Sequence, residues 1–383
     1  MKKALVATAV SAAFVAPATA LAQSAAAVPT LDKVLEASGV TVSGWIDTQY
    51  THANRNLETG FSDRVFDSQN NSFALHQFGL QVAKQPKEGA GGLVNITAGK
   101  DAQVIHAFPE TAAPGAAATT TSMFDITQAY GQYASGPLTL MAGKFVTLHG
   151  TEVIASTGNN NISRSILFGS VPFTHTGLRT VYAMSDTVSL TAGLNNGWDQ
   201  LQDTTKGKTL ELGMSLTPIK PLSIVASSYF GKETTNAIAT PGASEGKRSS
   251  ANLVATYTVS DALSVGAEYL RVQQDNFASL SGGGTIKAKY DGLAGYLTYM
   301  ITPKLRAAGR LESFKDTDGL RFLANAGTKY REATATLGYL PSPSFEVRGE
   351  IRQDRASNSV FTESSGAMSK TLLTYALQAI FKF

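Results

Sequence analysis

The strongest constraint on the fold is an alternation of apolar and polar residues with a period of two, recurring from about residue 40 to Phe383 at the C-terminus. In LSVGAEYLRV, for example, Leu263, Val265, Ala267 and Tyr269 share one face. Successive side chains point to opposite faces in a β-strand, so each such segment is predicted to be a strand. The count is about 16, at residues 40–51, 72–84, 92–102, 124–135, 138–147, 176–185, 187–196, 208–218, 221–231, 249–259, 262–272, 287–301, 304–315, 329–340, 344–355 and 371–383.

The connections between these segments alternate in length. The short ones read QPKEGAG, ASGP, MSD, TPIKP, VSD, TPK and PSP, and the long ones include 103–123, 147–176, 197–208, 232–248, 273–285, 316–327 and 355–369. A soluble sandwich has no reason to maintain this asymmetry, and its strands are usually nearer 5 or 6 residues. Segments of about 10 residues cross a bilayer when they are tilted. We therefore predict an all-β fold, a transmembrane antiparallel up-and-down β-barrel.

The N-terminus predicts export. Residues 1–22 begin with Lys2 and Lys3, continue as a short apolar run and end in Ala-Leu-Ala, as secretory signal peptides do. Cleavage after Ala22 leaves 23–39, in which VPTLDKVLEASG predicts a short periplasmic helix at the barrel mouth, followed by the barrel at 40–383. Localisation in the outer membrane of a Gram-negative bacterium follows, and the absence of Cys excludes disulfide bonds and a lipoprotein anchor.

The C-terminal strand is predicted to close the barrel. It would face lipid with Leu373, Tyr375, Leu377 and Phe381, with Phe383 in an interfacial aromatic girdle, and it would pair with the first strand near VTVSGWIDTQYT. Closure satisfies backbone groups that lipid cannot satisfy. The terminal Phe resembles the signal that the outer membrane barrel assembly machinery reads, so Tyr375, Phe381 and Phe383 are the predicted assembly signal.

The opposite faces of the strands carry charges of both signs. The inward set comprises Asp47, Glu211, Glu268, Glu312, Glu332, Glu346, Glu350, Asp354, Arg179, Arg306, Arg310, Arg348, Arg352 and Lys382. Such charges either line a selective pore or pair across strands and brace the wall. Arg306 and Arg310, assigned to a strand neighbouring 344–355, would extend the charges of FEVRGEIRQD or line an eyelet. About 16 strands enclose too wide a lumen for side chains alone to fill, so water occupies it unless a loop plugs it.

Several segments together are similar to the outer membrane beta-barrel porin-2 (OmpL-like) family: GWIDTQY, DSQNNSFALHQFGLQV, QAYGQY, LMAGKFVTLHGTEV, NNISRSILFGSVPFTHTGLR, LNNGWD and FEVRGEIRQDRASNSVF. The resemblance covers nearly the whole chain after residue 22. It implies a channel for passive diffusion of small hydrophilic solutes and ions, with the third long loop folded into the lumen and Glu152 and Arg164 at the constriction. A homotrimer is an analogy from the fold.

Other functions have little support in the sequence. The five histidines lack metal-ligand spacing, GKT at 207–209 has Gln202 where a phosphate-binding loop needs Gly, and no G-x-S-x-G elbow occurs. We therefore predict no enzyme, no cofactor and no metal. The 32 basic residues against 29 acidic ones become 30 against 29 without Lys2 and Lys3, which argues against nucleic-acid binding. The alternative is an adhesin or structural barrel that binds a partner through its external loops. The solute, ion preference and pore diameter stay open.

Overall fold

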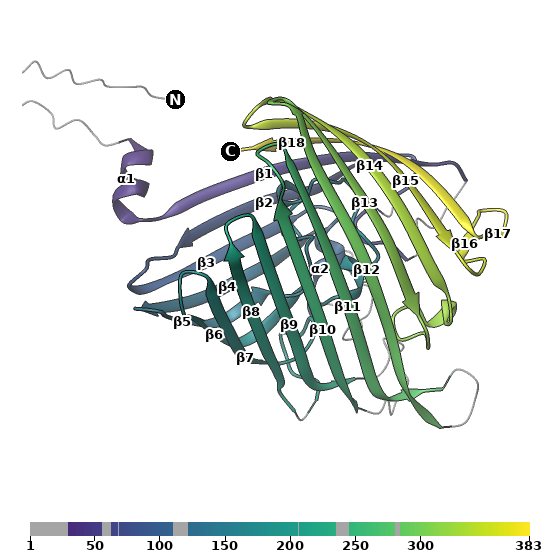
Figure 1. Ribbon diagram of the computed structural model, residues 1–383, viewed down its shortest axis with the longest axis horizontal. Coiled ribbons are helices and arrows are strands. Elements are labelled where there is room, and N and C mark those ends of the chain that lie inside the picture. The colour runs from purple at the N-terminus through teal and green to yellow at the C-terminus, as the bar shows by residue number, and fades with distance from the viewer. Residues whose placement is uncertain are drawn as a thin grey trace, which may run out of the picture. The chain divides into compact units, whose positions relative to one another are not determined.

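The computed structural model describes residues 30–55, 63–67, 69–109, 122–205, 207–234, 245–279 and 284–383. Sixteen antiparallel strands form a closed barrel (Figure 1) in the order β1-β18-β15-β14-β13-β12-β11-β10-β9-β8-β7-β6-β5-β4-β3-β2. Their bounds are β1 Thr41–Ala53, β2 Ser72–Lys84, β3 Gly89–Ala98, β4 Phe124–Ser135, β5 Leu138–Val146, β6 Thr174–Ala183, β7 Val188–Asn195, β8 Thr209–Ile219, β9 Leu222–Thr234, β10 Glu245–Thr258, β11 Leu263–Ala278, β12 Thr285–Thr302, β13 Leu305–Asp316, β14 Lys329–Ser342, β15 Phe345–Ala356 and β18 Thr371–Lys382. The predicted class and strand number are confirmed.

The barrel closes between its first and last strands. β1 pairs with β18 from Trp45↔Lys382 to Ala53↔Thr374. Beyond the ladder, Gly44 N donates to Phe383 O over 2.8 Å and Phe383 N donates to Gly44 O over 3.0 Å. The chain therefore ends on a paired residue, and both neighbours of the last strand are present, as the sequence predicted.

The connections alternate in length as expected, with some bounds corrected. Strands β10, β11 and β12 extend beyond the predicted 249–259, 262–272 and 287–301 at the end of the long loops. The prediction stopped where the apolar face became polar, but backbone pairing continues through exposed polar positions such as Lys232↔Lys247. The loop after β15 also contains a small hairpin, β16 (Phe361–Thr362) with β17 (Met368–Ser369), and the loop after β3 contains helix α2 (Ala102–Ile105).

One neighbour relation was predicted wrongly. Arg306 and Arg310 lie on β13, whereas Arg348 and Arg352 lie on β15, and β14 lies between these strands. The two sets of arginines therefore interact only across or over β14.

Helix α1 (Leu31–Ser38) forms a compact unit separate from the barrel. The bond from Val34 N to Thr30 O, 3.2 Å, marks its first turn. The predicted helix is confirmed, whereas its position at the barrel mouth stays a prediction. The predicted signal peptide lies outside the described residues. Within the described ranges, no helix is long and apolar enough to cross a membrane.

The two faces of the wall differ as the alternation requires. On β18, Tyr375, Leu377 and Phe381 point outward with 47%, 59% and 45% of their surfaces exposed, while the inward Thr374 and Gln378 are buried. Two apolar clusters lie inside the barrel. The first joins wall residues such as Leu270, Tyr290, Phe314 and Leu372 to Ile166, Leu167 and Val171, and the second joins Phe66, Ile105, Ile154 and Phe168. Part of the interior is thus a packed core.

Candidate pore constriction

The connection between β5 and β6, residues 147–173, folds into the barrel and is called the inserted loop below. It contains two short 3-10 turns, η1 (Ser156–Gly158) and η2 (Phe168–Ser170). Its residues Ile162, Ser163, Leu167 and Ser170 are almost completely buried. A loop with this burial must find partners for its backbone polar groups, because lost hydration of an unpaired group is costly.

Three inward carboxylates of the wall supply acceptors for loop N–H groups. Glu268 on β11 accepts from Thr151 N over 2.9 Å. Glu312 on β13 accepts from Ile166 N over 2.9 Å and from Leu167 N over 2.6 Å. Glu350 on β15 accepts from Ile162 N over 2.6 Å and from Ser163 N over 3.0 Å. These strands hold five successive points of the loop through charge-assisted hydrogen bonds.

Three inward arginines supply donors for loop carbonyls. Arg310 Nη1 on β13 donates to Ser163 O over 2.8 Å. Arg352 Nη1 on β15 donates to Arg164 O over 2.5 Å. Arg348 Nη1 donates to Ser156 O over 3.4 Å. Because the wall alternates carboxylates and guanidinium groups, both the N–H and the C=O groups of the loop find partners.

The same arginines also pair with carboxylates. Arg310 Nε bonds Glu332 over 2.9 Å and its Nη1 bonds Glu152 of the inserted loop over 2.7 Å. Arg352 Nη2 bonds Asp354 over 2.8 Å. The side chains of Arg310 and Arg352 have no exposed surface. Removing one partner would leave a buried charge uncompensated, which is strongly destabilising.

Glu152 and Arg164, the predicted constriction residues, lie within the loop and shape it. Glu152 Oε2 accepts from Ser165 N over 2.9 Å. Arg164 donates to three loop carbonyls, those of Val153, Ile162 and Ile154, over 2.9–3.2 Å. Its guanidinium lies 5.5 Å from the Phe66 ring centroid. Both residues are buried. Their contacts are with other residues of the loop and with the residues packed against it, such as Arg310 and Phe66.

Asp47 holds the first 3-10 turn. Its Oδ2 accepts from Ser156 Oγ on η1 over 2.5 Å and from Gln378 Nε2 on β18 over 2.9 Å. Nearby, Gln77 Oε1 on β2 accepts from Ser156 N over 3.0 Å. The seam between the first and last strands therefore contacts the inserted loop directly.

Two further predicted residues lie away from these loop contacts. Arg179 on β6 donates from Nη2 to Glu211 over 2.9 Å and to Val146 O over 3.0 Å. Arg306 on β13 pairs with Glu346 on β15, passing over β14 at Gly338. A Cβ at Gly338 would approach Glu346 Oε1 to 2.9 Å, so glycine leaves the space for this pair. With 14% of its side chain exposed, Arg306 is more accessible than Arg310, Arg348 or Arg352.

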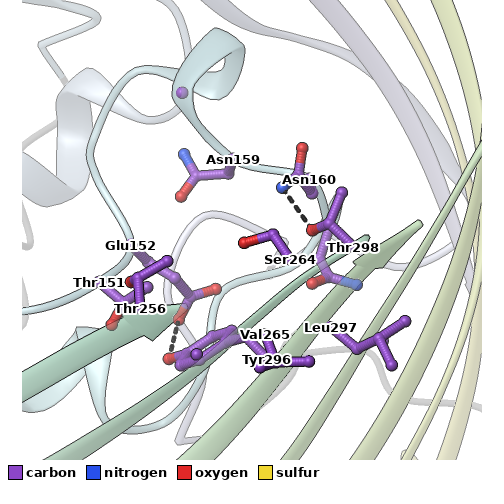
Figure 2. Close-up of a pocket in the computed structure, with 14 residues that line it drawn as sticks. Thr151, Glu152, Asn159, Asn160, Thr256, Ser264, Val265, Tyr296, Leu297 and Thr298 are labelled. Carbon is purple, nitrogen blue, oxygen red and sulfur yellow. Dashed lines mark hydrogen bonds between the residues drawn. The ribbon is translucent and has the colours of Figure 1, made fainter. Parts of the chain in front are cut away.

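A pocket of about 120 Å³ separates part of the inserted loop from the inner wall (Figure 2). Thr151, Asn160, Thr256, Ser264, Tyr296 and Thr298 are among the residues that line it. Asn160 Nδ2 donates to Thr298 Oγ1 over 2.8 Å, and the Tyr296 hydroxyl lies 3.5 Å from Glu152 Oε2, as Figure 2 shows. The lining therefore combines hydroxyl and amide groups with the Glu152 carboxylate and with apolar surface from Val265 and Leu297.

Neutral anchors of the loop were not predicted from the sequence. Asn252 on β10 accepts from Gly150 N over 3.0 Å, and Gln77 Nε2 on β2 donates to Ile154 O over 2.8 Å. His149 of the loop contacts Ser227 and Ser250 through its two ring nitrogens, over 2.7 and 2.8 Å. Burial, with a smaller contribution from nearby His175, lowers the pKa of His149 from 6.5 to about 3. Gln77 and Asn252 lie at inward positions of their strands, so the alternation gave a signal for them, but the sequence prediction of pore residues was confined to charged side chains.

The residues predicted to line the pore or its constriction were Asp47, Glu152, Arg164, Arg179, Glu268, Arg306, Arg310, Glu312, Arg348 and Arg352. The structure brings eight of these ten into direct contact with the inserted loop or into the loop itself, all except Arg179 and Arg306. Whether any of them determines permeation stays a prediction. Their burial and pairing favour the bracing role over direct contact with solutes. Across the described part of the chain, no cluster of three or more metal-ligating side chains occurs.

Comparisons with known proteins agree with this geometry. The model of a family described as "Putative beta-barrel porin-2, OmpL-like" matches residues 39–383. The chain belongs to this family. It is therefore a porin of the bacterial outer membrane, and both the resemblance noted in the sequence and the channel function that it implies are confirmed.

Three solved structures that share the fold of this porin are distant from it in sequence. The outer membrane channel DcaP of Acinetobacter baumannii has 13% identity and a TM-score of 0.62, over 90% of this chain and 97% of that one. OprB of Pseudomonas putida has 14% identity and a TM-score of 0.61, over 92% and 96%. The trimer form of OmpT of Vibrio cholerae has 12% identity and a TM-score of 0.58, over 90% and 99%. No curated protein sequence matches significantly.

Proposed function

We propose that this porin is a narrow diffusion channel, without catalytic activity, whose bore is set by the inserted loop. The observation that supports the proposal is the fixed position of residues 147–173, anchored to Glu268, Glu312 and Glu350 on three different strands. A 16-strand barrel without such a loop would leave a wide aqueous lumen. With the loop in place, solutes pass only through the space that the loop leaves.

We further propose that the channel has only weak preference between anions and cations. Arg310, Arg348 and Arg352 each bond a carboxylate within 3 Å and are buried, so their fields largely cancel. The pocket beside the loop presents hydroxyl and amide groups, and the carboxylate of Glu152 in its lining is paired with Arg310. Such a lining suits small neutral hydrophilic solutes, which exchange hydrogen bonds with water for bonds to the wall at little cost.

Thiol labelling of single-cysteine variants tests the route, because the chain has no native Cys. Asn160→Cys places a thiol in the exposed part of the pocket, and Leu293→Cys places one on the outward face of β12, where Leu293 is 57% exposed. In planar bilayers, a bulky water-soluble thiol reagent should lower the single-channel conductance of the first variant and leave that of the second unchanged. Equal responses of the two variants would contradict a route along this pocket.

Channel formation itself is tested separately. Liposomes that contain the refolded porin should admit small sugars faster than empty liposomes, at rates that fall steeply with solute size. Uptake equal to that of empty liposomes would reject the channel and favour the alternative of an adhesin or structural barrel. Conductance as large as that of an unobstructed lumen would keep the channel and reject the role of the inserted loop.

Export processing and oligomeric state are proposed as well. We propose removal of residues 1–22 on export, which N-terminal sequencing of the mature protein would check. We also propose a homotrimer, supported by the trimer form recorded for the OmpT structure that shares this fold. Native mass spectrometry of the porin extracted from membranes would give its stoichiometry.

A further inference from the structure

Four bases gather on the outward face of three adjacent strands, at the end of the barrel that carries the long loops. Lys315 lies on β13, Lys329 and Arg331 on β14, and Arg355 on β15. These three strands are labelled in Figure 1. Each is exposed, while the residue that follows it on its strand is buried and faces the interior. These four residues are called the basic cluster. We propose that the basic cluster binds the phosphate group of a lipid in the outer leaflet of the membrane.

The first argument is the register of the strands. Lys315 lies directly opposite Lys329 on β13 and β14, and Arg331 lies directly opposite Arg355 on β14 and β15. Like charges directly opposite one another in a sheet destabilise it. An anion that contacts both members of a pair would convert this repulsion into attraction.

The second argument is that the cluster lacks internal counter-charges. No member forms an ion pair within 4.0 Å with any residue that the structure describes. In register, the neighbouring acid is Asp291 on β12, opposite Lys315. The inward acids Glu332 and Asp354 of the same strands are buried and paired with Arg310 and Arg352 on the other face of the wall. The cluster therefore presents an excess of about three positive charges to its surroundings.

The third argument is position relative to the lipid-facing belt. Leu311 on β13 is 68% exposed and Ile351 on β15 is 44% exposed, and each lies four residues before a base of the cluster. At about 3.3 Å per residue, this separation is about 13 Å along a strand. Long loops of such barrels lie outside the cell. The bases thus lie at the level of outer-leaflet headgroups, just beyond the apolar surface.

The surface below the cluster suits an acyl chain. Ala333 lies beside Leu311 and Ala335 lies beside Ile351, so β14 presents a strip of small side chains between two larger ones. A lipid could place its chain along this strip while its phosphate reaches Lys329 and Arg331. Arg binds phosphate through two parallel N–H donors and Lys through a point charge, so the cluster offers both kinds of contact.

The test uses the refolded full-length barrel in a zwitterionic detergent and counts bound lipids by native mass spectrometry. The probes are phosphatidic acid, phosphatidylcholine with the same acyl chains, and inorganic phosphate. Lys329→Gln with Arg331→Gln removes one member of each opposed pair. The matched control is Lys220→Gln with Lys304→Gln, which removes two exposed bases from short turns at the other end of the barrel. Heat-modifiable gel mobility verifies that every variant is folded.

We expect phosphatidic acid to bind at least tenfold more tightly than phosphatidylcholine. At about 1 kcal/mol for each base near a membrane surface, the cluster variant should lose roughly 30-fold in affinity for phosphatidic acid. The control should stay within about twofold of wild type. Equal losses in the two variants, or equal affinity for the two lipids, would overturn the proposal. Inorganic phosphate binding as tightly as phosphatidic acid would assign the cluster to a soluble anion instead and likewise overturn it.

Discussion

Glu312 offers the sharpest test of how the inserted loop is held. Its two carboxylate oxygens accept from Ile166 N and Leu167 N over 2.9 and 2.6 Å, in a buried part of the barrel. Replacement of Glu312 by Ala removes both acceptors and leaves two buried N–H groups unpaired. Each unpaired group costs about 1–3 kcal/mol, so the seat of the loop should lose about 2–6 kcal/mol.

This loss would act on the loop and not on the barrel as a whole. The sheet ladder on both sides of β13 is unaffected, because Glu312 contributes its side chain only. Since 1.4 kcal/mol is a tenfold change in an equilibrium constant, a loss of about 4 kcal/mol raises the population of a released loop by nearly a thousandfold. We expect a higher mean single-channel conductance, larger current fluctuations and faster proteolysis within residues 147–173.

The control is Glu346→Gln. Glu346 is also an inward, buried carboxylate, but it bonds Arg306 and Arg348 of the wall and reaches the inserted loop only through Arg348, whose contact with Ser156 O is long at 3.4 Å. This variant should have nearly unchanged open-channel noise. If the conductance, noise and proteolysis of Glu312→Ala match those of both the wild type and Glu346→Gln, the loop does not depend on this anchor. The proposed link between anchoring and bore would then be refuted.

Three further predictions concern other parts of the molecule. Replacing Arg306 and Arg310 with Ala should lower the melting temperature with little change in reversal potential, because both pair with carboxylates; a large change in ion preference with unaltered melting would contradict bracing. Phe383→Asp should lower the outer membrane yield, because the backbone of Phe383 closes the barrel against Gly44 and its ring packs so tightly on Gly44 that a Cβ on that glycine would lie 2.4 Å from the ring. Normal yield and normal heat-modifiable mobility would count against a role of Phe383 in assembly. His149 takes up its proton in the unfolded chain near pH 6.5 but in the folded protein only near pH 3, so stability falls as pH drops below 6.5. By pH 4.5 the loss is on the order of 2–3 kcal/mol, and melting curves of His149→Asn should lack this slope.

The barrel could be predicted from the sequence because its signal is local and repeated. The residues of LSVGAEYLRV or FEVRGEIRQD show their faces without knowledge of any partner. Sixteen strands, their order around the barrel and closure by β18 follow from that signal and from the rule that lipid leaves no backbone group unpaired. Strand ends were less accurate, as β11 shows by continuing to Ala278, because pairing does not stop where the apolar belt stops.

The candidate site could be predicted from the sequence only in part. The inward direction of Glu312, Glu350, Arg310 and Arg352 followed from alternation, but their partners did not. Those partners include backbone groups of the inserted loop, which lies more than 140 residues earlier in the sequence. For example, Glu312 accepts a hydrogen bond from Ile166 N. Backbone donors and acceptors are the same at every residue, so no side-chain pattern identifies which of them a distant carboxylate will meet.

The sequence by itself determined the class of protein, the membrane it enters and the face on which each strand residue lies. These properties depend on the period of two and on solvation by lipid or water, both of which act residue by residue. The family resemblance implied that the third long loop enters the lumen, but only the tertiary structure decided which wall groups hold residues 147–173 there and that the charges meet loop groups and not a water-filled pore. It also decided that Lys315 faces Lys329 and Arg331 faces Arg355. Such contacts depend on the exact register of strands and loops, which is fixed by the sum of many weak pairings across the whole barrel.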